Sequence, residues 1–149
     1  MMGLLSWART KSPWIAVLHA GGCNNCDIEV LDVLTPRFDV ERLGILWKQN
    51  PRQADILIVN GCVSKHSKVF VKRIHDQMLE PKAVVAIGSC ACTGGVFVGG
   101  KGTDVKETHT IIGGVDKVFP VDVYVPGCPP KPEAIIQGVA LAIEKLGEK

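Results

Sequence analysis

The chain has 149 residues, a length that suits one domain with a single hydrophobic core. Hydrophobic residues make up 46% and charged residues 21%, and the formal net charge is only +2, which argues against a disordered chain and against a nucleic-acid-binding protein. No apolar run approaches the roughly 20 residues that a membrane-spanning helix needs, and the first residues lack the apolar core of a signal peptide. We therefore expect a cytoplasmic protein whose six cysteines serve metal or redox chemistry and not structural disulfides.

Apolar periodicity predicts short strands that alternate with helices. Strands are predicted at residues 14–19, 43–47, 54–59, 83–87 and 121–125, and helices at residues 24–34, 65–79 and 132–146. The candidate inner-face positions of the second helix are Val69, Val71, Ile74 and Met78. Residues 99–112 are polar and contain glycines, which predicts a loop. Because each strand is an uninterrupted apolar run, the pattern predicts an α/β fold with a mostly parallel sheet and helices on both faces.

Cysteines follow the predicted strands. Cys23, Cys62, Cys90 and Cys128 each come just after a predicted strand end, and Cys26 lies one turn into the following helix. An open α/β sheet binds its ligands at the carboxyl ends of its strands. The segments GGCNNCDIE, GSCACTGG and VPGCPPKPEA also carry glycines, which let the backbone turn sharply and approach a bound group closely. We therefore expect the cysteines of these three segments to share one crevice.

An iron–sulfur cluster and structural zinc are the two candidate occupants of such a crevice. Iron–sulfur clusters are held by four cysteine thiolates. Small zinc sites usually combine two close cysteine pairs, whereas here the pair Cys23 and Cys26 meets two distant single cysteines. The spacing favours the cluster. A C-x-x-C pair alone would fit half a zinc site or a redox dithiol equally well, and a site without metal is the third interpretation.

Over almost its entire length the chain resembles the small-subunit family shared by [NiFe] hydrogenases and the homologous cluster-bearing subunit of respiratory complex I. The motif G-x-C-x-x-x-G-G is present from Gly88 to Gly95, and P-G-C-P-P-[RK]-P-E-A from Pro126 to Ala134. The resemblance implies a flavodoxin-like fold with one [4Fe-4S] cluster at the carboxyl ends of the strands. The ligands that it implies are Cys23, Cys26, Cys90 and Cys128.

Within this family, the spacing of Cys23 and Cys26 resembles hydrogenase small subunits, because the complex I subunits have adjacent cysteines instead. Soluble and periplasmic hydrogenase small subunits are longer, with a Tat signal and a further domain that holds two more clusters. This chain is therefore similar to the short small subunits of membrane-bound, energy-converting hydrogenases of the Ech, CO-induced and formate-hydrogenlyase groups. It departs from them at Asn25, where a glycine is expected.

The resemblance implies an electron-transfer subunit of a hydrogenase complex that is not catalytic alone. Its proximal cluster would exchange electrons between the ferredoxin-fed clusters of a polyferredoxin subunit and the NiFe centre of a large subunit. The implied complex has integral membrane subunits, lies at the cytoplasmic face of the membrane, takes electrons from ferredoxin and couples H₂ chemistry to ion translocation. Two alternatives stay open: a complex I-like quinone or sulfur reductase without nickel, and, from another class, a zinc-stabilised binding module.

The other two cysteines, one glutamate and the four histidines are not expected to be cluster ligands. Cys92 falls in the variable middle of its motif and Cys62 matches no family ligand, so neither is expected to bind the cluster. Glu29 is a candidate proton relay or tuner of the cluster, with a helix N-terminal acid, like Asp27, as the plainer interpretation. No paired spacing suggests a metal site among the four histidines, which are His19, His66, His75 and His109.

Two segments are expected to form interfaces. Residues 1–13 combine apolar and basic side chains and are predicted to be an N-terminal docking segment, separate from the cluster domain at residues 14–149. Trp14 and residues 96–98 are predicted to lie on the rim of the crevice, where a partner subunit would cover them.

Overall fold

The computed structural model describes residues 2–98 and 110–149, with the backbone alone for residues 2–6. Most of the loop predicted at residues 99–112, and His109 within it, lies outside the described residues. The end of that predicted loop is instead a short strand, β6, at Ile111–Gly113. None of the helices in the described part of the chain is both long and apolar enough to cross a bilayer.

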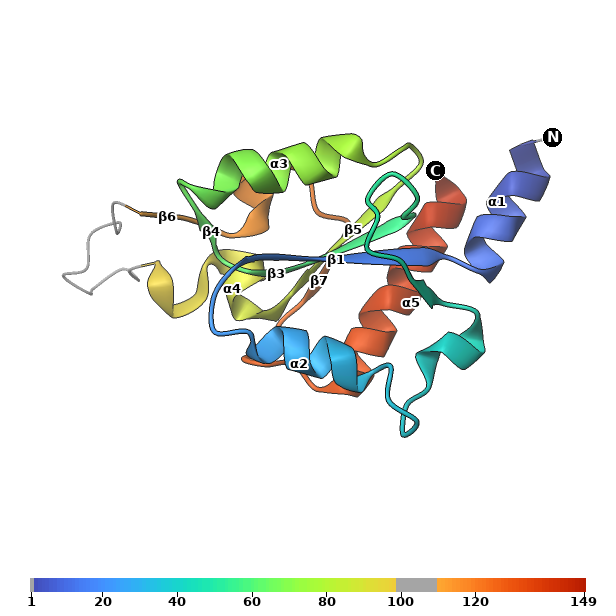
Figure 1. Ribbon diagram of the computed structural model, residues 1–149, viewed down its shortest axis with the longest axis horizontal. Coiled ribbons are helices and arrows are strands. Elements are labelled where there is room, and N and C mark those ends of the chain that lie inside the picture. Colours follow the sequence, from blue (N-terminus) through green and yellow to red (C-terminus); the bar gives the residue numbers. More distant parts are fainter. Residues whose placement is uncertain (1, 99–109) are drawn as a thin grey trace.

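A parallel five-stranded sheet forms the centre of the molecule, in the order β2-β1-β3-β5-β7 (Figure 1). Its strands are β1 at Trp14–Gly21, β2 at Leu46–Trp47, β3 at Ile56–Gly61, β5 at Ala83–Ile87 and β7 at Val123–Val125. This order is that of flavodoxin-like folds, so the predicted fold class is confirmed. Strand β2 is shorter than predicted, because a 3-10 turn at Val40–Leu43 and Gly44, at φ 90°, precede it.

Helices cover both faces of the sheet. They are α1 at Met2–Lys11, α2 at Asn25–Asp32, α3 at Ser67–Gln77, α4 at Gly88–Thr93 and α5 at Pro132–Glu148. Figure 1 shows α2 and α5 on one side of the sheet and α3 on the other. Beyond the carboxyl ends of the strands, β4 at Val63–Ser64 pairs antiparallel with β6. Helices α1 and α4 and this small second sheet were not predicted from the sequence.

Strand β3 separates two hydrophobic cores, because its successive side chains point to opposite faces. Ile56 and Ile58 pack with α2 and α5, whereas Leu57 and Val59 pack on the side of α3. Val71 on α3 and Met78 directly after it are buried, and Ile74 is half-buried. The inner-face prediction was wrong for Val69, which is 64% exposed. Val69 lies two residues before Val71, about 200° around the helix, and therefore faces solvent.

The first helix packs against the last one, at the end of the molecule away from the cysteines (Figure 1). Arg9 Nε lies 3.5 Å from Asp55 Oδ1, and Asp55 Oδ2 accepts a hydrogen bond of 3.0 Å from the Trp14 backbone N–H. Burial raises the pKa of Asp55 above its ordinary value. The segment predicted to dock onto a partner thus also contacts this chain, and its docking role stays a prediction.

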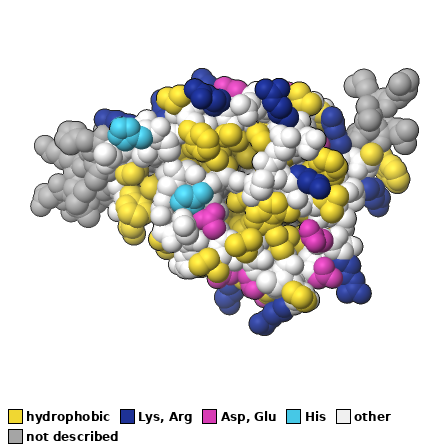
Figure 2. All heavy atoms as spheres, viewed as in Figure 1, with side chains coloured by type: hydrophobic (Ala, Val, Ile, Leu, Met, Phe, Trp, Pro, Cys, Tyr) yellow, Lys and Arg dark blue, Asp and Glu magenta, His cyan; other side chains and the backbone are white. Residues whose placement is uncertain are grey.

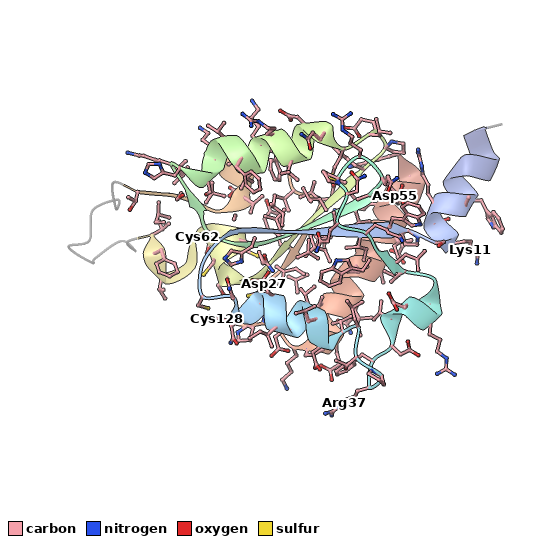
Figure 3. All side chains as sticks on the ribbon, in the orientation of Figure 1. Lys11, Asp27, Arg37, Asp55, Cys62 and Cys128 are labelled. Carbon is pink, nitrogen blue, oxygen red and sulfur yellow. The ribbon has the colours of Figure 1, made fainter. Side chains whose placement is uncertain are left out.

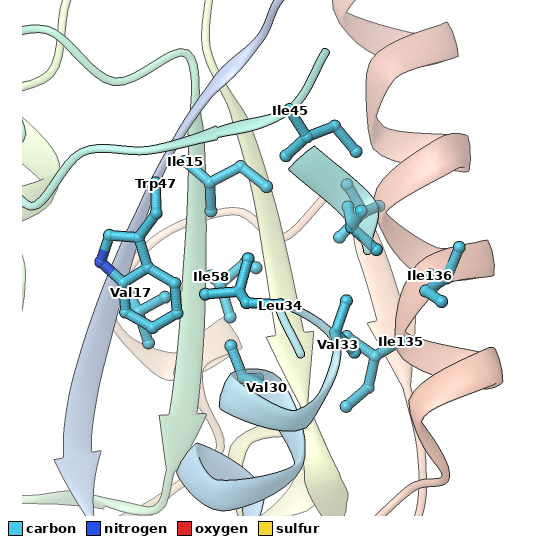
Figure 4. A pocket seen from close by; sticks show the side chains of 12 residues that line it. Ile15, Val17, Val30, Val33, Leu34, Ile45, Trp47, Ile58, Ile135 and Ile136 are labelled. Carbon is cyan, nitrogen blue, oxygen red and sulfur yellow. The ribbon is translucent and has the colours of Figure 1, made fainter. Parts of the chain in front are cut away.

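A small apolar cavity of about 20 Å³ lies between the sheet and helices α2 and α5 (Figure 4). Val30 lines it from α2, Val33 lines it from the position directly after α2, and Ile135 lines it from α5. We expect Val33→Ile to fill part of this space and to raise the free energy of unfolding by up to about 1 kcal/mol, the value of one buried methylene. Val33→Ala should have the opposite effect. Denaturant titrations of the two variants check this, and a loss of stability in Val33→Ile would show that the cavity cannot take the extra group.

Candidate metal centre

Four cysteines gather at the carboxyl edge of the sheet. Cys23 follows β1, Cys26 lies in the first turn of α2, Cys90 lies in α4 directly after β5, and Cys128 follows β7. Because these strands are parallel, their carboxyl ends meet at the same edge (Figure 1). Cys23 and Cys128 are exposed, and Cys26 and Cys90 are half-buried. The structure thus brings the four predicted ligands to one end of the molecule.

A shared hollow contains three of these thiols. It is lined by Cys23, Cys26 and Cys90 together with His19 and Asp27. Figure 3 labels Cys128, Cys62 and Asp27 at this same end of the sheet.

Gly88 gives Cys26 the room that it needs. The backbone of Gly88 has φ 86°, a left-handed conformation that side chains rarely adopt. A Cβ atom at this position would lie 2.5 Å from the Sγ atom of Cys26. Any larger residue would therefore displace the thiol, which gives the glycine at the start of the GSCACTGG segment a physical role.

The thiols influence one another electrostatically. Burial is the main cause that raises the pKa of Cys26 to about 11, and charge on Cys90, Cys23 and Cys128 raises it further. Burial also raises the pKa of Cys90, followed by charge on Cys62, Cys128 and Cys23. Negative charge on the neighbouring thiols thus disfavours the thiolate forms of Cys26 and Cys90, and a bound cation would offset this effect.

The donor set fits an iron–sulfur cluster, which is held by four thiolates and supplies the positive charge that they need. No group of three or more His, Cys, Asp or Glu side chains in residues 7–98 and 110–149 is spaced to hold a single metal ion. In a four-iron cluster each thiolate binds a different iron atom, so the sulfurs need not surround one ion.

The raised pKa of Cys26 predicts slow alkylation in the metal-free chain. At neutral pH this thiol stays protonated, and only the thiolate reacts with iodoacetamide. We expect its labelling rate, measured by peptide mass spectrometry, to keep rising with pH up to about 11. The exposed Cys23 and Cys128 provide the comparison within the same sample. Labelling of Cys26 at neutral pH as fast as that of Cys23, in protein shown by circular dichroism to be folded, would contradict this expectation.

The remaining two cysteines are placed differently. Cys62 is only 4% exposed and directly follows β3, and burial raises the pKa of its thiol. The Cys92 thiol donates a hydrogen bond of 3.5 Å to the backbone carbonyl of Ala86, which directs it toward β5. Cys62 nevertheless lies close enough to influence Cys90 and shares a second hollow with Cys23. That neither residue binds metal stays a prediction.

A polar cluster beside the thiols was missed from the sequence. His19 Nδ1 lies 2.7 Å from Asp27 Oδ2, and the side-chain amide of Asn60 donates a hydrogen bond of 2.7 Å to Asp27 Oδ1. His19 and Asn60 are register partners on β1 and β3. The available signal was the presence of a polar residue at the end of each of two buried apolar strands.

Trp14 and residues 96–98 were both predicted to lie on the rim of the crevice. Trp14 is the first residue of β1 and lies at the amino end of the strand, so its placement on the crevice rim was wrong. Phe97 does lie near the thiols, because it lines the second hollow with Cys23 and Cys62. Val96 beside it is 88% exposed.

Glu29 is half-buried on α2. Among the described side chains, those that line the two hollows next to Cys23 do not include Glu29, whereas Asp27 does line one of them. A proton-relay role for Glu29 stays a prediction. Of the other histidines, His75 stacks on Phe119 at 4.3 Å between ring centroids, on the side of α3.

The fold and the site define a flavodoxin-like α/β protein that collects cysteine thiols at the carboxyl edge of its sheet. The model of one protein family, described as "NADH ubiquinone oxidoreductase, 20 Kd subunit", matches residues 23–142. The chain belongs to this family, and the predicted resemblance is confirmed at that level.

Relatives within the family come from different complexes. The probable membrane-bound hydrogenase subunit mbhJ of Pyrococcus furiosus is 46% identical over 138 residues, which cover 93% of this chain and 78% of the relative. An NADH-quinone oxidoreductase subunit of Geotalea daltonii is 41% identical over 147 residues, covering 99% and 79%. A chain of the solved membrane-bound sulfane sulfur reductase, an archaeal respiratory membrane complex, has a TM-score of 0.80 at 34% identity, covering 99% of this chain and 77% of that one.

Proposed function

We propose that this chain is the electron-transfer small subunit of a membrane-bound, energy-converting [NiFe] hydrogenase. Cys23, Cys26, Cys90 and Cys128 would hold one [4Fe-4S] cluster. The observation that carries the proposal is the gathering of these four thiols at one edge of the sheet, where three of them influence the pKa of Cys26. When bound, the cluster supplies one-electron transfer, and the protein sets its position and its surroundings.

In an electron-transfer subunit, the residues of this chain would hold the cluster and expose it to a partner. The thiolates would hold the iron atoms, and Gly88 leaves space for Cys26. Because Cys23 and Cys128 are exposed, the site lies at the surface, within reach of an electron-transfer partner. The role requires no hydrogen-binding site in this chain, which is why the complex and not the subunit would perform 2 H⁺ + 2 e⁻ ⇌ H₂.

Exposed apolar side chains near the site support a partner that covers it. Ile28 and Leu31 on α2 are 60% and 53% exposed, and Val96 follows Cys90 by six residues. Figure 2 shows hydrophobic side chains gathered in two areas of one face, one toward α3 and one toward α2. Exposed patches of this kind mark protein interfaces. We assign the surface beside the thiols to the NiFe large subunit.

The remaining partners follow from the same proposal. A polyferredoxin subunit, fed by ferredoxin, would deliver electrons, and integral membrane subunits would hold the complex at the cytoplasmic face of the membrane. The support is the likeness to a probable membrane-bound hydrogenase subunit. Docking by residues 1–13 and proton transfer by Glu29 are parts of this proposal that await their own tests.

A nickel-free reductase is the second candidate. The 34% identical chain of a sulfane sulfur reductase and the NADH-quinone oxidoreductase subunits among the relatives support it. The spacing of Cys23 and Cys26 supports the hydrogenase, because the resemblance associates adjacent cysteines with complex I subunits. A zinc-binding module is the third candidate. The visible absorption spectrum distinguishes it from the other two, because an iron–sulfur protein absorbs broadly in the visible range and a zinc protein does not.

Purification of the native complex through an affinity tag on this chain tests the proposal. The hydrogenase predicts iron in this subunit, nickel in a co-purifying large subunit, and H₂ evolution from reduced methyl viologen. Iron without nickel, together with sulfide production from polysulfide or with quinone reduction, would replace it by the second candidate. A colourless chain that contains zinc would replace both.

A further inference from the structure

The polar cluster of His19, Asp27 and Asn60 surrounds one carboxylate with a hydrogen bond at one oxygen and a close imidazole contact at the other. Asn60, at 0% exposure, donates its amide to one oxygen of Asp27, and the His19 ring nitrogen lies 2.7 Å from the other oxygen. The three residues come from α2, β3 and β1, and the last two strands pair directly. The hydrogen bond from Asn60 therefore positions the carboxylate, and the His19 ring lies against its second oxygen.

This carboxylate lies beside the thiols. Asp27 directly follows Cys26 in the chain, and it lines the same hollow as Cys23, Cys26 and Cys90, together with His19. After burial and the neighbouring thiolates, Asp27 is a further cause of the raised pKa of Cys26. A charge on Asp27 thus acts electrostatically on Cys26, one of the proposed cluster ligands.

Helix capping does not account for this arrangement. The N-cap residue of α2 is Asn24, and neither oxygen of Asp27 accepts a capping hydrogen bond in the described structure. Asn60 Oδ1, His19 Nδ1 and Asp27 Oδ2 are buried and have no hydrogen-bond partner among the described residues, an unfavourable state for buried polar atoms. The hydrogen bond to Asp27 is thus the contact that compensates part of the cost of burying the Asn60 amide.

We propose that Asp27, His19 and Asn60 set the reduction potential of the metal centre, with Asn60 as the residue that positions the carboxylate and His19 as the group that offsets its charge. This inference rests on the proposed function, because it concerns the cluster that the four cysteines would hold. Reduction adds one electron to the centre, so a nearby negative charge disfavours it and lowers the potential. A nitrogen-bearing ring against the carboxylate reduces that effect.

Asp27 and His19 should therefore have opposite effects on the reduction potential of the centre. Asp27→Asn removes the negative charge, keeps the shape of the side chain, and should raise the potential. His19→Leu leaves the carboxylate less compensated and should lower the potential. A role that only stabilises the fold would not produce shifts of opposite sign, because loosening the site acts in the same way whichever side chain is lost.

Potentiometric titration of the purified complex, followed by the EPR signal of this subunit's reduced cluster, measures the shifts. Asp76→Asn is the matched control, because Asp76 pairs with His75 at 3.2 Å on α3 and lines a hollow that contains no cysteine. The expected result is a higher potential in Asp27→Asn, a lower one in His19→Leu and no change in Asp76→Asn, at equal iron content. Unchanged potentials, or shifts of the same sign in both variants, would overturn the inference while leaving the cluster in place. A wild-type complex without iron in this subunit would overturn the proposed function as well.

Discussion

Replacing any one of the four proposed ligands by alanine should remove the cluster or convert it to a smaller one. These ligands are Cys23, Cys26, Cys90 and Cys128. A cluster with three protein thiolates leaves one iron atom open to solvent and to oxidation. We expect the largest loss of iron for Cys26 and Cys90, which are half-buried and so cannot be replaced by solvent ligands as readily as the exposed pair. Iron content, visible absorption and EPR of the reduced protein measure the effect.

The two remaining cysteines are the matched controls for that series. Cys92→Ala should leave the iron content unchanged, because its thiol is directed toward the Ala86 carbonyl. Cys62→Ala should also retain the iron, although this thiol lies nearer to the site and influences Cys90. Loss of iron in Cys92→Ala would mean that the wrong thiol of the GSCACTGG segment was chosen. Retention of the full cluster in any of the four alanine variants would remove that cysteine from the ligand set.

The central sheet could be predicted because its strands are buried on both faces. Strand β5 reads AVVAI, and all five residues are buried, so an unbroken apolar run was a sufficient signal. The crevice followed from the parallel order, since cysteines after different strands must then meet at one edge. The same reasoning places Trp14 at the opposite edge, because residue 14 starts the first predicted strand and the amino ends of parallel strands lie away from the crevice.

The missed features depend on contacts between distant segments. Helix α4 spans only Gly88–Thr93 and has no apolar period to detect. The hydrogen bond from Asn60 to Asp27 joins residues 33 positions apart, and the contact of Asn60 with His19 requires the pairing of β1 with β3. Neither is encoded in the local pattern. Sequence motifs thus located the candidate ligands, whereas the groups that would tune them became visible only in three dimensions.

Gly61 lies at the carboxyl end of β3 and lines the hollow that holds the cysteines. It ends β3 with φ 83° and is the register partner of Gly21, just after an irregularity in the pairing of β1 with β3. A Cβ atom at Gly61 would lie 1.9 Å from the backbone oxygen of Gly21, and 2.6 Å from its carbonyl carbon. Both contacts involve backbone atoms, so no side-chain rotation can relieve them.

Gly61→Ala should therefore be the most destabilising of the substitutions considered, by on the order of 3 kcal/mol or more, from the overlap and the left-handed backbone together. Strands β1 and β3 must separate at the point where the chain turns toward Cys23, so iron loading should fall as well. Gly147→Ala on α5 is the control. Among the described residues its Cβ would meet the Thr10 methyl, at 3.3 Å, and alanine is favoured over glycine within a helix by up to about 1 kcal/mol. Denaturant titration and iron analysis should show both losses in Gly61→Ala and neither in Gly147→Ala. Normal stability of Gly61→Ala would mean that the two strands can separate without disturbing the core, and that the close approach of Gly21 and Gly61 is not what shapes the crevice.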